Sequence, residues 1–291
     1  MTKRLPAHAP GGGARKEEDD TAIVIPLFER HSNLPYCGMV MLHAISLRRL
    51  HADVPLVICD YSRSAEVQRA LSRWRPLLRF DVQELSIRRD VAEFTLHDAL
   101  SLRYDAILQL ARLCAYDKLI CVEADMLATG PVLSLAEGDY HARFIDRSGS
   151  VSEGAAVSDC LLVLNMASES ALRLVALTRS LHQEHYVWGH LRGLTVSGAS
   201  GYSERLLEVA IRLLDRDGFG HITWREYESC YVHYARHNKK EHHRILGLAR
   251  SMLDERGYKD RFVADFGELE PLIFREASDV SGYPVQDAGT P

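Results

Sequence analysis

Short apolar runs alternate with segments of helical periodicity along most of this chain, and this alternation constrains its fold most strongly. Runs rich in β-branched residues at 22–25, 56–59, 118–122 and 161–164 predict buried strands, the first of which we expect to end at Pro26. Apolar residues recur at helical spacing over 36–50, 168–185 and 203–214, and Ser64 is placed to cap a further helix. Such an alternation is typical of an α/β protein with a mainly parallel sheet.

The chain is 291 residues long, with 46% apolar and 26% charged residues, the proportions of an ordinary globular protein. No linker interrupts its interior, so we expect a single domain over residues 21–276. Residues 1–20 contain three successive glycines and four successive acids. That segment and the tail 277–291, which is rich in glycine and proline, are predicted to be disordered.

Charge and cysteine usage narrow the class of protein. The formal net charge is -5, which argues against a nucleic-acid-binding protein. No apolar run approaches the roughly 20 residues of a membrane helix, and the first 20 residues lack the apolar core of a signal peptide. The six cysteines form no C-x-x-C pair and most lie in apolar runs, so buried free thiols and a reducing cytoplasm are expected.

Two acids directly follow one of the predicted strands. Glu123 and Asp125 stand one residue apart, just after the apolar run 118–122. In open α/β sheets, ligands bind beyond the carboxyl ends of the strands, and carboxylate oxygens suit Mg²⁺ or Mn²⁺. The pattern is compatible with a metal site that also holds a diphosphate, although two solvated acids explain the spacing alone more simply.

Two further stretches carry residues suited to nucleotide binding. Around 232–240, His233 is suited to complete a metal shell and Lys239 to neutralise a phosphate, although a solvated basic loop is the simpler interpretation of the composition. Tyr36, at the start of a predicted helix near the carboxyl edge of the sheet, could stack on a nucleobase or simply pack against the core.

Taken in order, these segments resemble family 8 glycosyltransferases, the glycogenin-like retaining enzymes of the GT-A fold, over roughly residues 21–241. The matching pieces are Asn-Leu-Pro-Tyr at 33–36 with a helix ending in Ser-Leu-Arg, Arg103-Tyr104 at the spacing of the family's Arg-Tyr helix start, Glu-Ala-Asp-Met-Leu at 123–127, the strand ending at Asn165, and His233 six residues before Lys239.

The resemblance implies a Rossmann-like, mainly parallel sheet flanked by helices, a UDP-sugar donor, and Mn²⁺ or Mg²⁺ as cofactor. It implies Glu123, Asp125 and His233 as metal ligands. The implied contacts of the nucleotide-sugar are Leu27, Asn33, Tyr36, Arg103 and Lys239, with Tyr36 against the base. Lys239 would also stabilise the departing diphosphate.

The sequence departs from the family pattern mainly on the sugar side. Glu123 replaces an Asp, Asp105 and Ala106 stand where the family has a further Arg, and Ser-Asp-Cys at 158–160 replaces Asn-Ser-Gly ahead of the strand. The family's Asp-Gln helix start matches only Ser203-Glu204. Asp159 and Glu204 therefore join Lys239 as candidate catalytic residues, although Glu204 is equally explained as the second residue after a helix cap.

The resulting expectation is transfer of a hexose from a UDP-sugar to a hydroxyl of a soluble acceptor, with retention implied by the resemblance. The altered motifs also fit a nucleotide-sugar-binding protein without turnover. A nucleotidyltransferase is a third interpretation, but Pro26-Leu27-Phe28 stands where its Gly-rich loop would follow the first strand. The expected partners are a donor and a small-molecule or glycan acceptor, and oligomerisation is left open. The stretch 244–261, mixed in charge, predicts a solvated helix.

Overall fold

The computed structural model describes residues 20–27, 34–61, 64–84, 96–113, 116–146, 157–192, 199–214, 217–233 and 239–273. The elements in chain order are β1 (Thr21–Leu27), α1 (Leu34–Leu50), β2 (Leu56–Asp60), α2 (Ala65–Leu78), β3 (Asp81–Glu84), α3 (Leu96–Leu113), β4 (Lys118–Val122), β5 (Met126–Ala128), the 3₁₀ helix η2 (Val132–Ala136), β6 (Ala142–Asp146), β7 (Val157–Asn165), α4 (Glu169–Arg192), α5 (Ala199–Leu213), β8 (Phe219–Thr223), α6 (Trp224–Cys230), β9 (Tyr231–His233), α7 (Lys239–Glu255), α8 (Lys259–Phe266) and α9 (Leu269–Ile273).

Seven strands form the central sheet in the order β3-β2-β1-β4-β7-β6-β8. The pairs β3-β2, β2-β1, β1-β4 and β6-β8 are parallel, whereas β7 runs antiparallel to both β4 and β6. A separate two-stranded antiparallel sheet joins β5 to β9. The expected fold class, α/β with a mainly parallel sheet flanked by helices, is confirmed.

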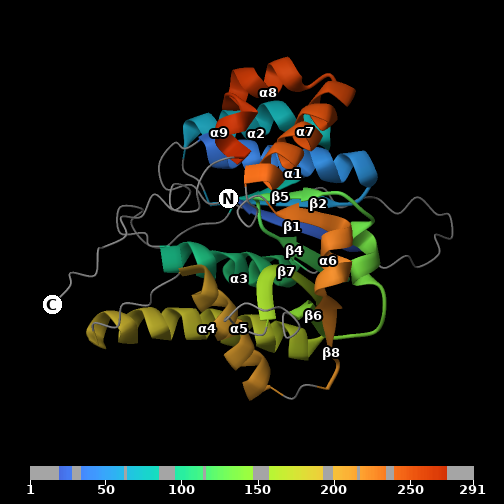
Figure 1. Cartoon of the computed structure of the whole chain (residues 1–291). Helices are drawn as coiled ribbons and strands as arrows, with labels where there is room; N and C mark the ends of the chain where they lie inside the picture. The colour runs from blue at the N-terminus through green and yellow to red at the C-terminus, as the bar shows by residue number, and fades with distance from the viewer. Residues whose placement is uncertain are drawn as a thin grey trace.

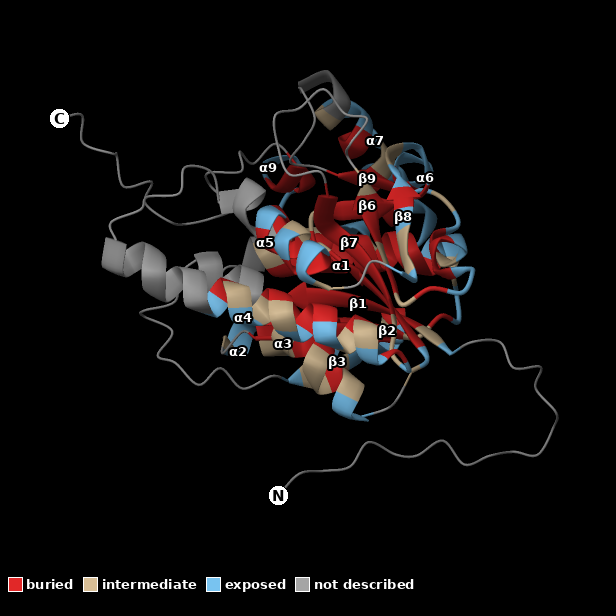
Figure 2. Cartoon of the chain, turned by 90° about the horizontal axis from the view of Figure 1, so that it is seen from below, coloured by how far each residue is buried: buried red, intermediate tan, exposed pale blue. Residues whose placement is uncertain are grey.

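Helices cover both faces of the sheet, with α1, α2, α7, α8 and α9 on one face and α3, α4 and α5 on the other (Figure 1). Along β1, Ile23, Ile25 and Leu27 belong to the core beneath the first group, while Ala22 and Val24 belong to the core of the second. This alternation follows from the two-residue period of a strand and explains why β1 is apolar at successive positions. Figure 2 shows the resulting layer of buried strands between helices whose outer surfaces are exposed.

The predicted elements are found, with some different limits. β1 continues through Pro26 to Leu27, because its pairing with β4 ends at Val24 and that edge needs no donor from Pro26. β7 begins at Val157 and so includes Asp159, which was expected to precede the strand. Ser64 caps α2, its hydroxyl accepting a hydrogen bond from the Val67 N–H at 3.4 Å.

The stretch 244–261 is largely helical, but the expectation that it is solvated holds for one side only. This stretch spans parts of α7 and α8, whose apolar residues are buried in the core with α1 and α2. The Trp74 indole of α2 lies edge-on to Tyr258 and Phe262 and donates to Asp265 Oδ2 at 2.8 Å. Mixed charge therefore marked only the outer side of amphipathic helices that close one face of the sheet.

The buried thiol prediction holds for Cys37, Cys59, Cys121, Cys160 and Cys230, which are buried and free. Cys114 lies outside the described residues. Among the described helices, none combines the length and the apolar character required to cross a membrane. The predicted disordered segments 1–20 and 277–291 lie outside the described residues except for Asp20.

Candidate functional site

Glu123 and Asp125 lie just beyond the carboxyl end of β4, in the turn that leads to β5. Across the sheet, β2 and β3 follow β1 on one side, whereas β4 pairs with β1 on its opposite side, so the strand order reverses between β1 and β4. The two acids thus lie at a switch point of the strand order, where open α/β sheets bind ligands. Their side chains are 24% and 23% exposed, so solvent reaches the carboxylates.

His233 reaches these acids through the small sheet of β5 and β9. Met126, directly after Asp125, pairs with His233, so the strand register places a residue 110 positions away beside the acidic turn. The His233 Nε2 lies 3.1 Å from Glu123 Oε2 and 3.5 Å from Asp125 Oδ1. The sequence-predicted metal ligands are therefore brought together, with one ligand atom from each within 4.8 Å of the others.

The spacing of these three atoms fits a divalent cation. Ligands bound at about 2.1 Å and at right angles to one another lie about 3 Å apart, close to both distances from His233 Nε2. Two carboxylates with one imidazole form a mixed oxygen and nitrogen set that suits Mn²⁺ and also accepts Mg²⁺. His233 is buried, whereas the two acids are partly exposed, so the cluster is open to solvent on the side of the carboxylates.

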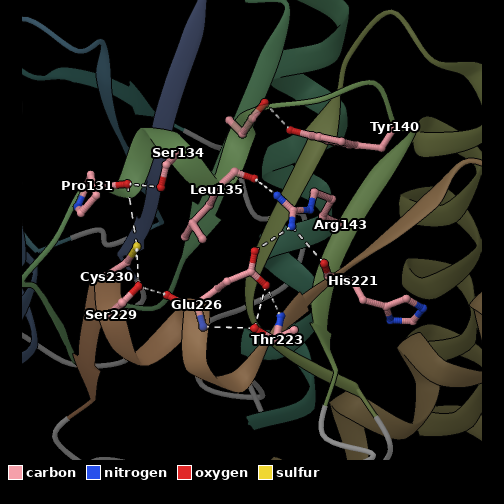
Figure 3. A network of polar contacts seen from close by, with 11 residues as sticks. Pro131, Ser134, Leu135, Tyr140, Arg143, His221, Thr223, Glu226, Ser229 and Cys230 are labelled. Carbon is pink, nitrogen blue, oxygen red and sulfur yellow. Dashed lines mark hydrogen bonds and ion pairs between the residues drawn. The ribbon is translucent and has the colours of Figure 1, made fainter.

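Polar contacts hold α6, the helix that leads directly into the strand with His233 (Figure 3). Thr223 and Glu226 form a capping box at the start of α6, and Arg143 of β6 reaches Glu226 at 3.4 Å and the Leu135 carbonyl at 2.9 Å. At the other end of α6, the Cys230 carbonyl accepts a hydrogen bond from the Thr129 N–H at 2.8 Å. The helix is thereby held against η2 and β6, and β9 follows it directly.

Gly130 is required where this segment meets the end of β5. A Cβ on Gly130 would lie 2.1 Å from the carbonyl oxygen of Ser229, which is backbone and cannot rotate away. We expect Gly130→Ala to lower the free energy of unfolding by about 1–3 kcal/mol, as overpacking does elsewhere. Urea denaturation measures the change, and Gly247→Ala is the matched control because nothing lies within 4 Å of its added methyl. Equal stability of the two variants would contradict the prediction.

Arg103 connects the acidic turn to β7. Its guanidinium lies 2.8 Å from Glu123 Oε1 and donates to the Asp159 carbonyl at 2.6 Å, with Asp159 Oδ2 at 3.3 Å. Burial alone would raise the pKa of Glu123, but the hydrogen bond with His233 and the charge of Arg103 hold that pKa well below its usual range. Glu123 is therefore ionised, and Oε2 is the oxygen that faces His233.

The two acids expected near the reacting sugar are both buried and engaged. Asp159 is 5% exposed and receives a hydrogen bond from the Tyr104 hydroxyl at 3.3 Å as well as the Arg103 contacts. Glu204 is 4% exposed and receives one from the Ser158 hydroxyl at 2.8 Å. Glu204 is the sixth residue of α5, so the alternative that places it second after a cap is wrong. Arg103 and Tyr104 lie within α3, not at a helix start as the resemblance implied.

The remaining predicted donor contacts are only partly described. Leu27 is buried at the end of β1, and Tyr36 is half-buried near the start of α1, where its ring packs against the core. Asn33 lies outside the described residues. Lys239 begins α7, but its side chain is not described. A small cavity of about 10 Å³, lined by Pro26, Arg103 and Asp159 among apolar side chains, lies between α3 and the ends of β1 and β4.

Sequence reasoning missed His43 and Ser46, which line the inner side of the acidic turn. His43 Nδ1 lies 2.9 Å from the Glu123 carbonyl, and the Ser46 hydroxyl accepts from the Ala128 N–H at 2.9 Å. In the sequence, His43 stands at helical spacing among the apolar residues of the stretch 36–50. A titratable ring at such a position was the only signal available in the sequence.

No family model matches this sequence, and no curated protein matches it either. Among solved structures, the apo-form glycosyltransferase GlyE of Streptococcus pneumoniae TIGR4 is similar at 14% identity and a TM-score of 0.44, over 69% of this chain and 44% of GlyE. A glycosyltransferase involved in glycosylation of the major capsid of PBCV-1 is similar at 11% identity and a TM-score of 0.44, over 76% of this chain and 95% of that one.

The galactosyltransferase LgtC, in complex with donor and acceptor sugar analogues, is similar at 16% identity and a TM-score of 0.42, over 69% of this chain and 72% of LgtC. This chain therefore spans less than half of the length of GlyE. At such TM-scores these likenesses do not place the chain in a family.

Proposed function

We propose that this protein is a metal-dependent glycosyltransferase that moves a hexose from a UDP-sugar to a hydroxyl of a soluble acceptor, with retention of the anomeric configuration. The observation that carries the proposal is the convergence of Glu123, Asp125 and His233 at the switch point of the sheet. The resemblance to family 8 glycosyltransferases supports the choice of donor and the retention. A cytoplasmic location belongs to the same proposal.

In the proposed site, Glu123, Asp125 and His233 would hold the cation, each through one ligand atom. When bound, Mn²⁺ or Mg²⁺ would supply Lewis-acid stabilisation of the charge that develops on the departing diphosphate. Arg103 binds Glu123 Oε1 and so orients this carboxylate with its other oxygen toward His233. Lys239, the first residue of α7, is proposed to neutralise the diphosphate, and Asp159 and Glu204 are proposed near the sugar.

Thermal unfolding with UDP and Mn²⁺, added singly and together, tests the donor assignment. Binding to the folded state raises the melting temperature, and we expect the full shift only with both ligands, since the cation would offset the repulsion between the diphosphate and the two acids. Mass spectrometry of UDP released from a panel of UDP-sugars then identifies the sugar. No shift with UDP and Mn²⁺ together would contradict the donor assignment, as would equal shifts with and without the metal.

One set of contacts favours a second candidate, a nucleotide-sugar-binding protein without turnover. Asp159 is engaged by Arg103 and Tyr104, and Glu204 by Ser158, so neither buried acid is presented simply to solvent. The two candidates share the UDP and Mn²⁺ shift and differ in UDP release. A shift without release of UDP from any sugar, with acceptors present, would favour the binding protein. A shift with nucleoside triphosphates alone would instead indicate a nucleotidyltransferase.

Tyr36 provides a separate test of the base site. If its ring stacks on the nucleobase, Tyr36→Ala is expected to weaken UDP binding by about 1–3 kcal/mol, the contribution of aromatic stacking to base binding in single-strand binders. Titration calorimetry in saturating Mn²⁺ measures the loss. Tyr36→Phe is the matched control because it keeps the ring, and its affinity should stay close to that of the wild type. Unchanged affinity of the alanine variant would remove Tyr36 from the base site.

A further inference from the structure

His43 of α1 contacts the backbone of the first proposed metal ligand. The ring is fully buried, and its Nδ1 lies 2.9 Å from the carbonyl oxygen of Glu123. A carbonyl only accepts hydrogen bonds, so Nδ1 carries a proton and donates it to Glu123.

The same ring also contacts the strand that carries the third ligand. His43 lies edge-on to Tyr231, with ring centroids 5.5 Å apart and an interplanar angle of 86°. Tyr231 and His233 are two residues apart on β9, and side chains at this spacing point to the same face of a strand. One side chain on α1 therefore contacts both segments that converge on the site, although they are about a hundred residues apart in the chain.

Ser46 extends this contact one helical turn further along α1. Its hydroxyl accepts a hydrogen bond from the Ala128 N–H at 2.9 Å and donates to the His43 carbonyl at 2.7 Å. Ala128 is the residue of β5 that pairs with Tyr231. The helix thus holds the end of β4, β5 and β9 in one arrangement, with His43 at the point nearest to Glu123.

The other nitrogen of His43 indicates that stability alone does not explain this residue. Nε2 is buried and makes no hydrogen bond with any residue in the described part of the chain. An unsatisfied buried nitrogen is unfavourable, and an apolar ring of similar volume would avoid it. The gain from histidine is the Nδ1 donor to the Glu123 carbonyl.

We infer that His43 is a positioning residue that fixes the backbone of Glu123 against β9, so that Glu123 and His233 stand at the separation one divalent cation requires. The inference deepens the proposed function and rests on it for the presence of a metal. Residues that orient metal ligands in this way typically change metal affinity by about 10–100-fold when they are replaced.

The test measures Mn²⁺ affinity of the full-length protein by calorimetry, together with thermal unfolding without metal. His43→Phe keeps a ring beside Tyr231 but removes the donor, and we expect about tenfold weaker Mn²⁺ binding or more at a nearly unchanged melting temperature. His43→Asn places its amide nitrogen near the position of Nδ1 and should restore most of the affinity. His43→Gln places it near Nε2 and should not.

The control variant is His141→Phe, which removes another histidine hydrogen bond, the one between Nδ1 and the Ser168 hydroxyl at 2.8 Å. The His141 carbonyl accepts a hydrogen bond from the Asn165 N–H, and Asn165 pairs with Lys118, at the opposite end of β4 from Glu123. The Mn²⁺ affinity of His141→Phe should therefore equal that of the wild type. Wild-type affinity in His43→Phe would overturn the inference and leave the proposed function standing. If His43→Phe fails to fold, equal affinities of the Asn and Gln variants would overturn it. A wild-type protein that binds no Mn²⁺ would overturn both.

Discussion

Asp125→Ala is expected to abolish the Mn²⁺-dependent rise in melting temperature and to reduce UDP release by about a thousandfold or more. Asp125 belongs to the cluster of three possible ligands found in the described residues, so its loss leaves only Glu123 and His233 to hold the cation. Loss of a metal's Lewis-acid contribution, several kcal/mol of transition-state stabilisation, corresponds to about that factor in rate. Calorimetry with Mn²⁺ and mass spectrometry of released UDP measure the two effects.

The side chain of Asp125 is partly exposed, so the variant should fold. Asp53→Ala is the matched control: its carboxylate is 90% exposed in the turn before β2, away from the carboxyl ends of the strands. Asp125→Asn separates charge from shape, because an amide keeps one oxygen but not the negative charge, and we expect it to behave almost like the alanine variant. Unchanged Mn²⁺ affinity in Asp125→Ala would show that the cation binds elsewhere.

Arg103→Met is expected to lower the free energy of unfolding by about 3–5 kcal/mol at pH 7, the usual cost of removing one partner of a buried ion pair. The Arg103 side chain is 7% exposed and contacts the carboxylates of Glu123 and Asp159, which the methionine would leave without their cation. The pKa of Arg103 lies well above its usual value: burial opposes this, but the charges of Asp159 and Glu123 outweigh it. Urea denaturation of the metal-free protein measures the loss.

The loss of stability in Arg103→Met should depend on pH in a definite direction. The pKa of Glu123 is held below its usual range in the folded wild type, so its contribution to stability is present above the ordinary carboxyl pKa and is lost as the pH falls. The difference between wild type and Arg103→Met should therefore shrink from pH 7 toward pH 3. Arg179→Met is the matched control: Arg179 of α4 pairs with Asp105, which lies in α3 like Arg103, but Arg179 is 36% exposed, so its loss should cost no more than about 1 kcal/mol. Equal losses in the two variants would contradict the argument.

Local patterns predicted most of the elements because each of them is determined by neighbours in the chain. The run at 118–122 became a buried strand, and the two acids after it lie at its exposed end as expected. The predictions that were wrong, on the end of β1 and on the exposure of α7 and α8, depended on residues that are distant in the chain. Pro26 remains in a strand because β4 has already ended beside it, and the apolar residues of α7 and α8 are buried because α1 and α2 lie beneath them.

The features of the site likewise divide into those that local sequence determined and those that depended on distant contacts. The sequence by itself determined the chemical types, two carboxylates at a strand end and a histidine after a short apolar segment, because such types can be identified without knowing any contact. Only the tertiary structure decided that Met126 pairs with His233, that Arg103 binds Glu123 and Asp159 together, and that His43 bonds the Glu123 carbonyl. Those contacts join residues that are 20 to 107 positions apart, and no periodicity or spacing along the chain specifies which distant segments pack against each other.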